Sequence, residues 1–298
     1  MIIALLASTL ALGALVLGGA VLLGLYPWVP ADLGGVPDLD REARRVRIPV
    51  GATDAVDGWW LPGHRGVVVL VFHGYGRNHT RAWRYGTFLN QAGYDVLAID
   101  FRSSRRVARK PTTLGHFELG DGQATLDWVR RHPELGGMRV AILGESLGGA
   151  VALILAASNP EVVAVVADCA FATGRLALEE SSERWARLPR WPSGRILETV
   201  VKAATGRDPK AVDAVAAAST LADRPIFFIH GIEDDRFSPE QARALWRAAG
   251  AKDPLWLIPG VGHNEGWKRE RRLYEERVRA FLACHLLGEG PGLPAGEM

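Results

Sequence analysis

The sequence has little cysteine and little net charge, and both shortages narrow the functions it can serve. Cys169 and Cys284 are its two cysteines among 298 residues, which excludes a disulfide framework and a zinc site of the CxxC type. A formal net charge of +2 does not indicate the strongly basic surface that binds a nucleic acid. No GxGxxG follows a strand pattern, and there is no P-loop. We therefore expect no metal ion, no cofactor and no nucleic-acid partner.

Charge is absent from the first 31 positions, and the run over residues 1–26 is apolar enough to cross a bilayer. Tyr26 and Trp28 stand at its end, where interfacial aromatic residues are common, and Pro27 ends the helical pattern. A cleaved signal peptide is the alternative. It would need a basic segment before the run and a shorter apolar stretch. The pattern favours a retained transmembrane anchor over residues 1–26.

A linker over residues 27–44 follows the predicted anchor. Four arginines between positions 41 and 47 come after the apolar run, whereas no basic side chain precedes it. Because short flanking segments rich in arginine stay on the inner side of a membrane, we expect the rest of the chain in the cytoplasm.

Apolar runs alternate with helical patterns between residues 45 and 288, which we expect to form one domain. Alternation of this kind predicts an α/β fold with a mostly parallel sheet and helices on both faces. Period-two patterns over 46–50 and 55–62 predict an antiparallel hairpin at one edge. A final helix is expected over 266–287, followed by a flexible tail over 289–298. The buried strands are predicted over 66–74, 94–100, 139–146, 162–170, 225–231 and 254–260.

Residues 173–221 interrupt this alternation. The stretch is too long for a simple crossover and contains several helical patterns, so a helical cap over the carboxyl ends of the strands fits best. A crossover helix with a long loop is the alternative. Trp185 and Trp191 are candidates for an apolar acyl pocket or for a cap surface that faces a membrane.

Ser146 lies at the join between a predicted strand and a predicted helix, in the pentapeptide GESLG. A G-x-S-x-G at such a join places the serine on a sharp turn, and the glycines let strand and helix approach closely. The backbone N–H of Leu147 stands at the helix N-terminus, where negative charge is stabilised. A second N–H is expected from Tyr75, in the loop after the strand over 66–74. We interpret Ser146 as a nucleophile and Leu147 and Tyr75 as its oxyanion hole.

A serine nucleophile needs a base and an acid that orients the base. Asp234 and His263 follow Ser146 in the expected chain order, and each comes directly after a predicted strand. Asp235 competes with Asp234 because the two are adjacent. Asp168 is a second rival, because it ends an earlier strand.

Other reactive residue types fit structural roles better. His73 and His230 each precede a glycine at a strand end and are expected to be hydrogen-bonded structural residues, and Cys169 is expected to be a small core residue. A basic cluster follows the strand over 94–100. It could attract anionic headgroups or an acidic substrate, or it could be a solvated loop. Its members are Arg102, Arg105, Arg106, Arg109 and Lys110.

The sequence resembles the α/β-hydrolase serine hydrolases, close to the membrane-anchored Bem46-like group. The resemblance runs from about residue 30 to about residue 285 and rests on DGWWLPG, VFHGYGRN, AIDFR, LGESLGGA, HGIEDDRFSPE and GVGHNEGW. It implies the α/β-hydrolase fold, and the same roles for Ser146, His263, Asp234, Tyr75 and Leu147. The sequence departs from the family after the strand over 94–100, where DFRSSRRVARK replaces the usual DxRGxGxS.

These observations predict a membrane-anchored serine hydrolase that cleaves carboxylic acyl esters through an acyl-enzyme. A thioesterase or lysophospholipase that acts on membrane-derived acyl substrates is the first alternative, and a serine peptidase is the second. A membrane-tethered binding protein on a hydrolase scaffold is the non-enzymatic alternative. Such a protein is expected to have lost a member of the triad, and none is missing here.

Overall fold

The computed structural model describes residues 19, 24–29, 42–105, 110–185 and 187–293. Eight strands form one sheet in the order β1-β2-β4-β3-β5-β6-β7-β8. β1 and β2 pair antiparallel to each other, β2 pairs antiparallel to β4, and the remaining neighbours are parallel. The predicted α/β class and the edge hairpin are therefore confirmed. The strands are β1 (Arg44–Val50), β2 (Asp54–Leu61), β3 (Val67–Phe72), β4 (Asp95–Asp100), β5 (Arg139–Glu145), β6 (Val162–Asp168), β7 (Ile226–Gly231) and β8 (Trp256–Ile258).

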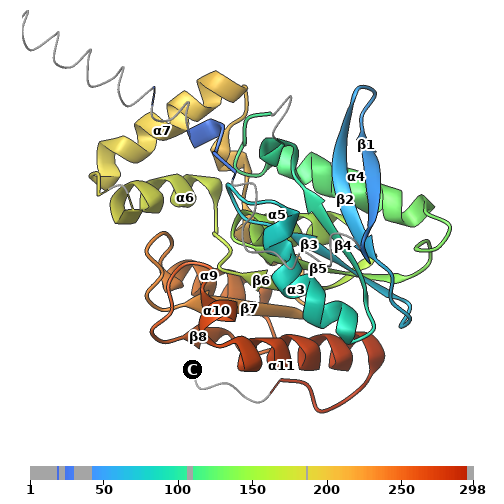
Figure 1. The fold of residues 1–298 in the computed structure, drawn as a ribbon. Helices are drawn as coiled ribbons and strands as arrows, with labels where there is room; N and C mark the ends of the chain where they lie inside the picture. Colours follow the sequence, from blue (N-terminus) through green and yellow to red (C-terminus); the bar gives the residue numbers. More distant parts are fainter. Residues whose placement is uncertain (1–18, 20–23, 30–41, 106–109, 186, 294–298) are drawn as a thin grey trace, which may run out of the picture.

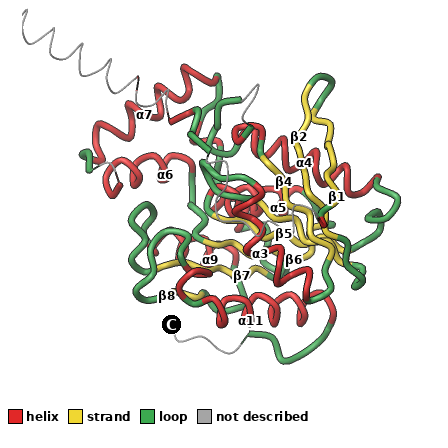
Figure 2. Tube along the Cα trace, viewed as in Figure 1, coloured by secondary structure: helices red, strands yellow, loops and turns green. Residues whose placement is uncertain are grey.

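Helices cover both faces of the sheet, and Figures 1 and 2 show the strands in the centre with helices around them. The α-helices are α3 (His79–Gln91), α4 (His116–Arg131), α5 (Leu147–Ser158), α6 (Gly174–Glu180), α7 (Arg190–Thr205), α8 (Ala214–Ala218), α9 (Pro239–Ala249), α10 (Gly266–Arg269) and α11 (Arg271–Leu282). Two 3-10 turns are η1 (Arg102–Ser104) and η3 (Pro209–Ala211), and two π-helical turns are η2 (Ser181–Trp185) and η4 (Ala283–Leu287).

The core has two layers because successive side chains of a strand point to opposite faces. In β3, Val68, Leu70 and Phe72 join one layer, with α4, α5 and α9. Val69 and Val71 join the other layer, with α3 and α11. Every residue of β3 is buried, as its uninterrupted apolar run predicts for a strand covered on both faces.

The helices α6, α7 and α8 lie in the stretch between β6 and β7 where the sequence predicts a cap. Figure 1 shows α6 and α7 together beyond one end of the sheet. We refer to residues 174–211, from the start of α6 to the end of η3, as the cap helices. They connect to the loop after β7, because Glu180 accepts hydrogen bonds from the Ser238 backbone N–H and hydroxyl at 2.6 and 3.0 Å.

The final helix is not continuous, contrary to the sequence prediction of one helix over 266–287. Glu270 leaves the helical conformation (φ −118°, ψ 40°) between α10 and α11. The hydrogen-bond ladder nevertheless continues, since the Glu270 N–H donates to the Gly266 carbonyl and the Glu270 carbonyl accepts from Tyr274. The break is therefore a bend, which sequence periodicity does not reveal.

The predicted anchor over residues 1–26 lies almost entirely outside the described residues, as do residues 30–41 of the predicted linker. No helix within the described ranges is long and apolar enough to span a bilayer. Of the predicted tail, residues 289–293 are described. There Glu289 forms an ion pair with Arg65 at 2.7 Å, and Leu293 packs against the core.

Candidate active site

Ser146 occupies a strained turn between β5 and α5. Its φ of 55° and ψ of −112° place a non-glycine residue at positive φ, which costs free energy and is typical of functional sites. Steric constraints explain why glycines stand on either side of Ser146. A Cβ on Gly144 would lie 2.2 Å from the Gly148 carbonyl oxygen, and one on Gly148 would lie 2.3 Å from the Phe72 carbonyl oxygen. The turn can therefore form only because both side chains are missing.

A chain of hydrogen bonds connects the three residues that the sequence predicts as a triad. The Ser146 Oγ lies 3.0 Å from the His263 Nε2, and the His263 Nδ1 lies 2.7 Å from the Asp234 Oδ2. Asp234 follows β7, and His263 follows β8, so both side chains come from the edge of the sheet where Ser146 also lies. The structure thus brings together residues that are 88 and 29 positions apart in the sequence.

Asp234 is fully buried and firmly held. Its Oδ1 accepts hydrogen bonds from the backbone N–H groups of Arg236 and Phe237 at 2.8 and 2.9 Å. Burial acts to raise the pKa of Asp234, but the hydrogen bond and charge of His263 outweigh it, so this pKa lies below its ordinary value. The carboxylate stays ionised and can hold the proton of His263 on Nδ1.

The two rival acids do not contact His263 in this way. Asp235 is exposed. The carboxylate of Asp168 accepts hydrogen bonds from the Tyr85 and Tyr274 hydroxyls at 3.1 and 2.9 Å. Burial, and then the charge of Glu145, raise the pKa of Asp168. By geometry, Asp234 is the acid that pairs with His263.

The loop after β3 lies directly against the nucleophile. A Cβ on Gly74 would lie 3.3 Å from the Ser146 Cβ, and the next residue is Tyr75. His73 holds this loop in place. Its Nε2 accepts from the Phe101 backbone N–H at 3.1 Å, so its Nδ1 donates to the Gly74 carbonyl at 2.8 Å. His73 is thus a hydrogen-bonded structural residue, as the sequence predicts.

A buried ionic cluster beneath the site was not predicted from the sequence. Glu145, next to Ser146, forms an ion pair with Arg84, and the Arg81 Nε lies 3.6 Å from its carboxylate. Both arginines also donate to the backbone carbonyl of Asn264, each at 3.3 Å. Burial acts to raise the pKa of Glu145, but the two arginines lower it to about 2. The cluster connects the neighbour of Ser146 to the neighbour of His263.

The ligand atoms of Cys169, His230 and Asp234 lie within 4.8 Å of one another. Their chemistry does not suit a metal ion. Burial raises the pKa of the Cys169 thiol well above its ordinary value, which disfavours the thiolate that a metal requires. Asp234 is already bound by His263 and by backbone N–H groups. The His230 Nε2 lies 3.2 Å from the Phe237 carbonyl and 3.3 Å from the Asp234 carboxylate, which fits a structural role.

Two arginines of the basic cluster after β4 do not contribute to an exposed charged surface, whereas Lys110 is exposed. Arg102 pairs with Asp121 at 2.5 Å and with Asp54 at 3.3 Å, and Arg105 pairs with Asp54 at 2.8 Å. Both arginines are mostly buried, because the hairpin of β1 and β2 supplies the carboxylate that neutralises them. Arg106 and Arg109 lie outside the described residues. An anion-attracting role for Arg102 and Arg105 is therefore corrected to a structural one.

Trp185 and Trp191 are the two tryptophans of the predicted cap. The side chain of Trp185 lies outside the described part of the chain. Trp191, in the first turn of α7, is 78% exposed, so it does not line an enclosed acyl pocket.

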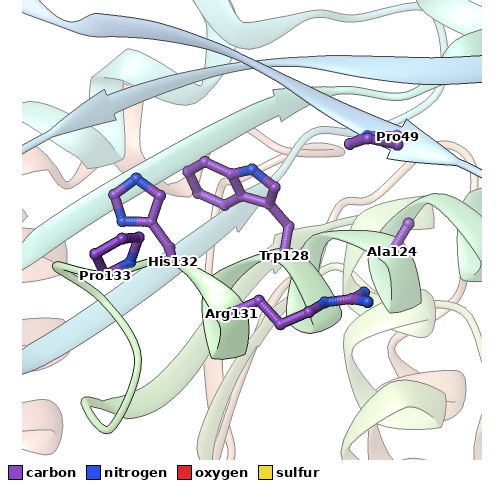
Figure 3. Close-up of a pocket in the computed structure, with 6 residues that line it drawn as sticks. All are labelled: Pro49, Ala124, Trp128, Arg131, His132 and Pro133. Carbon is purple, nitrogen blue, oxygen red and sulfur yellow. The ribbon is translucent and has the colours of Figure 1, made fainter.

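A hollow of about 390 Å³ lies away from this site, between β1 and α4 (Figure 3). Pro49 on β1 faces Trp128 and His132 on the opposite side. None of the residues that line it belongs to the Ser146 site, so it has no evident part in the chemistry.

Comparison with known proteins agrees with the fold. Residues 68–276 match the sequence profile described as the alpha/beta hydrolase family. The chain is 25% identical over 216 residues to the uncharacterized protein YqkD of Bacillus subtilis, covering 72% of this chain and 70% of that protein. It is 24% identical over 240 residues to the alpha/beta hydrolase domain-containing protein WAV2 of Arabidopsis thaliana, covering 75% and 73%.

Solved structures show the same fold. An esterase of Pyrococcus furiosus superposes with a TM-score of 0.68 at 24% identity, covering 88% of this chain and all of that one. An acylaminoacyl peptidase of Pyrococcus horikoshii superposes with a TM-score of 0.62 at 15% identity, covering 85% of this chain and 43% of that one. At these identities the likeness concerns the fold alone.

Proposed function

Because this chain belongs to the alpha/beta hydrolase family, we propose that it is a serine hydrolase that cleaves carboxylic acyl esters. Ser146 is the nucleophile, His263 the base and Asp234 the acid that orients the base. The observation that carries the proposal is the unbroken chain of hydrogen bonds from the Ser146 hydroxyl through His263 to the Asp234 carboxylate. The strained backbone of Ser146 supports it independently.

In the first half of the reaction, the Ser146 Oγ attacks the ester carbonyl carbon while the His263 Nε2 accepts the hydroxyl proton. The negative charge that develops on the carbonyl oxygen is stabilised by the backbone N–H groups of Leu147 and Tyr75. Each such donor contributes about 3 to 4 kcal/mol. The ester C–O bond then breaks, His263 gives its proton to the leaving alcohol, and the acyl group stays on Ser146.

In the second half, His263 takes a proton from a water molecule that attacks the acyl carbon. The bond to the Ser146 Oγ breaks, the serine regains its proton from His263, and the carboxylic acid leaves. Asp234 keeps its charge throughout and stabilises the protonated His263. The reaction needs no group beyond water.

We also propose that residues 1–23 of the predicted anchor hold the chain in a membrane, since residues 24–26 pack on the domain, and that the catalytic domain lies on the cytoplasmic side. The uncharged sequence of this stretch and the arginines that follow it support the proposal. In sealed membrane vesicles of known orientation, added protease should digest the domain only where the cytoplasmic face is outward. Digestion only in vesicles of the opposite orientation would contradict the assigned side.

Replacement of the nucleophile tests the chemistry. Ser146→Ala should lower the kcat for a short p-nitrophenyl ester by about 10⁴-fold or more and abolish labelling by a fluorophosphonate, because the hydroxyl bonded to His263 is removed. Ser158→Ala is the matched control, since Ser158 is exposed at the other end of the same helix. Normal labelling of the Ser146 variant would refute the assignment.

A further inference from the structure

Large apolar side chains that remain exposed are gathered at one end of the molecule. The described residues include seven, and all lie near the carboxyl edge of the sheet. Tyr26 and Trp28 are in the segment 24–29, and Leu188, Trp191 and Ile196 are in the cap helices. The other two are in the loops after β3 and β7, beside Ser146 and Asp234. Isolated exposed apolar residues are ordinary, but their confinement to one end indicates a contact surface.

Trp28 and Trp191 are the two most exposed of these residues, at 79% and 78%. A tryptophan has a large apolar body and a polar N–H, a combination suited to the boundary between water and lipid. The two come from parts of the chain more than 160 residues apart. Their arrangement therefore results from the fold and not from one apolar stretch of sequence.

The segment 24–29 is packed into this end of the molecule. Leu25 is buried against Leu197 and Val201 of α7, and its carbonyl accepts a hydrogen bond from the Thr112 N–H at 2.8 Å. The Gly24 carbonyl accepts from the Tyr75 hydroxyl at 2.5 Å. Figure 1 shows this blue segment beside α7. The segment 24–29 therefore packs on α7 and on the loop after β3, which lies against Ser146.

The cap helices also carry a net positive charge. They carry eight basic and five acidic side chains, a net charge of +3, whereas the whole chain has +2, so the remaining residues carry −1. Basic residues near a membrane are attracted to anionic headgroups. Exposed apolar residues combined with positively charged cap helices fit an anionic lipid surface better than a neutral protein surface.

We infer that the face formed by the segment 24–29, the cap helices and the loops after β3 and β7 docks on an anionic lipid bilayer. We call it the docking face. It includes the loops that carry Tyr75 and Asp234 beside Ser146, so an ester held in the bilayer would lie close to the nucleophile. The inference rests on the proposed esterase function, and it adds the source of the substrate.

Two substrates separate docking from catalysis. The full-length chain is reconstituted in phosphatidylcholine vesicles with or without about 30% phosphatidylglycerol, an anionic lipid. A long-chain p-nitrophenyl ester held in the bilayer is compared with a short, water-soluble one. Trp28→Ser with Trp191→Ser should lower kcat/KM about tenfold for the bilayer-held ester, since two buried aromatic contacts are lost, and less than about twofold for the soluble ester. The wild type should cleave the bilayer-held ester faster when phosphatidylglycerol is present.

Trp128→Ser is the matched control, because Trp128 lies beside the hollow between β1 and α4 and away from the docking face. It should leave the ratio of the two rates unchanged. If the double variant keeps the wild-type ratio of the two kcat/KM values, whether neither rate falls or both fall equally, the inference is overturned. A rate that does not depend on phosphatidylglycerol would also overturn it. If the wild type cleaves neither ester, the proposed function itself fails. Thermal unfolding of each variant confirms that it is folded.

Discussion

Asp234 and Asp235 are adjacent carboxylates with opposite environments. Asp234 is buried and hydrogen-bonded to His263, whereas Asp235 is exposed. The sequence could not separate them fully, because a shift of one residue in the loop after β7 would exchange their positions. Burial and contact decide between them.

Asp234→Asn should lower kcat by about 10⁴-fold, because an amide N–H at that position favours the His263 tautomer that cannot accept the serine proton. The measurement is kcat for a short p-nitrophenyl ester at neutral pH. Asp235→Asn is the matched control and should retain kcat within about twofold. If the two variants exchanged these effects, Asp235 would be the orienting acid.

Arg84 and Glu145 mark the limit of sequence reasoning for single residues. A helical pattern such as HTRAWRYGTFLNQ allows its charged residues to face water, so nothing local showed that Arg84 is buried. One signal was available. Glu145 stands at the end of a strand that is buried from Val140 onward, and a buried carboxylate requires a nearby cation. The partner itself could be found only in three dimensions.

At the scale of elements, the loop after β3 is held from two sides. On one side, the His73 Nδ1 donates to the Gly74 carbonyl. On the other side, the Tyr75 hydroxyl donates to the Gly24 carbonyl of the segment 24–29. The His73 contact was predicted from the sequence, because His73 precedes a glycine at the end of a strand. The second was not foreseen, because the sequence pattern assigned Gly24 to the predicted anchor.

Tyr75→Phe removes the hydrogen bond to Gly24 and keeps the backbone N–H. A net hydrogen bond stabilises by about 0.5 to 1.5 kcal/mol. We therefore expect kcat to fall about two- to tenfold through poorer positioning of the oxyanion donor, with little change in KM. Tyr26→Phe, on the same segment, is the control and should have the kcat of the wild type. Equal kcat values for both variants would show that the hydrogen bond between Tyr75 and Gly24 does not position the loop after β3.

Among the elements, strands were predicted best and the ends of helices least well. The apolar runs over Val67–Phe72 in β3 and over residues 140–144 in β5 predict buried strands, and both are buried. The strand predicted over 162–170 ends at Asp168, because Cys169 adopts positive φ. The bend at Glu270 was not predicted, because hydrogen bonding continues through it and the helical pattern of the sequence is unchanged.

At the scale of the whole molecule, buried charge connects stability to pH. The pKa of Glu145 is about 2 in the folded protein and about 4.3 in an unfolded chain. Between these values the unfolded state binds more protons than the folded state. The stabilisation from Glu145 is therefore fully present above about pH 4.3 and is lost as the pH falls toward 2.

Glu145→Gln should lower the free energy of unfolding at pH 7 by about 3 to 5 kcal/mol, because it leaves Arg84 buried without its counter-charge. The difference from the wild type should shrink as the pH falls from about 4.3 to 2. Urea unfolding at several pH values measures both effects. Glu289→Gln removes the exposed ion pair with Arg65 and should cost less than about 1 kcal/mol. A difference that stays constant with pH would contradict this account.

The overall architecture followed from the alternation of patterns, whereas the contacts that assemble the site did not. The edge hairpin, the parallel sheet and the order Ser146, Asp234, His263 were all predicted from the sequence. For the basic cluster after β4, the sequence left two interpretations open, a surface that attracts anions and a solvated loop. Asp54, about 50 residues earlier, neutralises Arg102 and Arg105, and such a distant partner has no local signature.

The position of the segment 24–29 bears on how the domain could be set free. A protease that cuts between residues 30 and 41 would separate the domain from any bound membrane, yet the residues that pack on α7 and tether Tyr75 would stay with the other fragment. Once the chain is broken, the contacts of this segment, among them Leu25 on α7 and the hydrogen bonds with Thr112 and Tyr75, must form between separate fragments, and that association has an entropy cost. Shedding and loss of turnover would then occur together, so the released domain would be a weakened enzyme and not a soluble copy of the attached one.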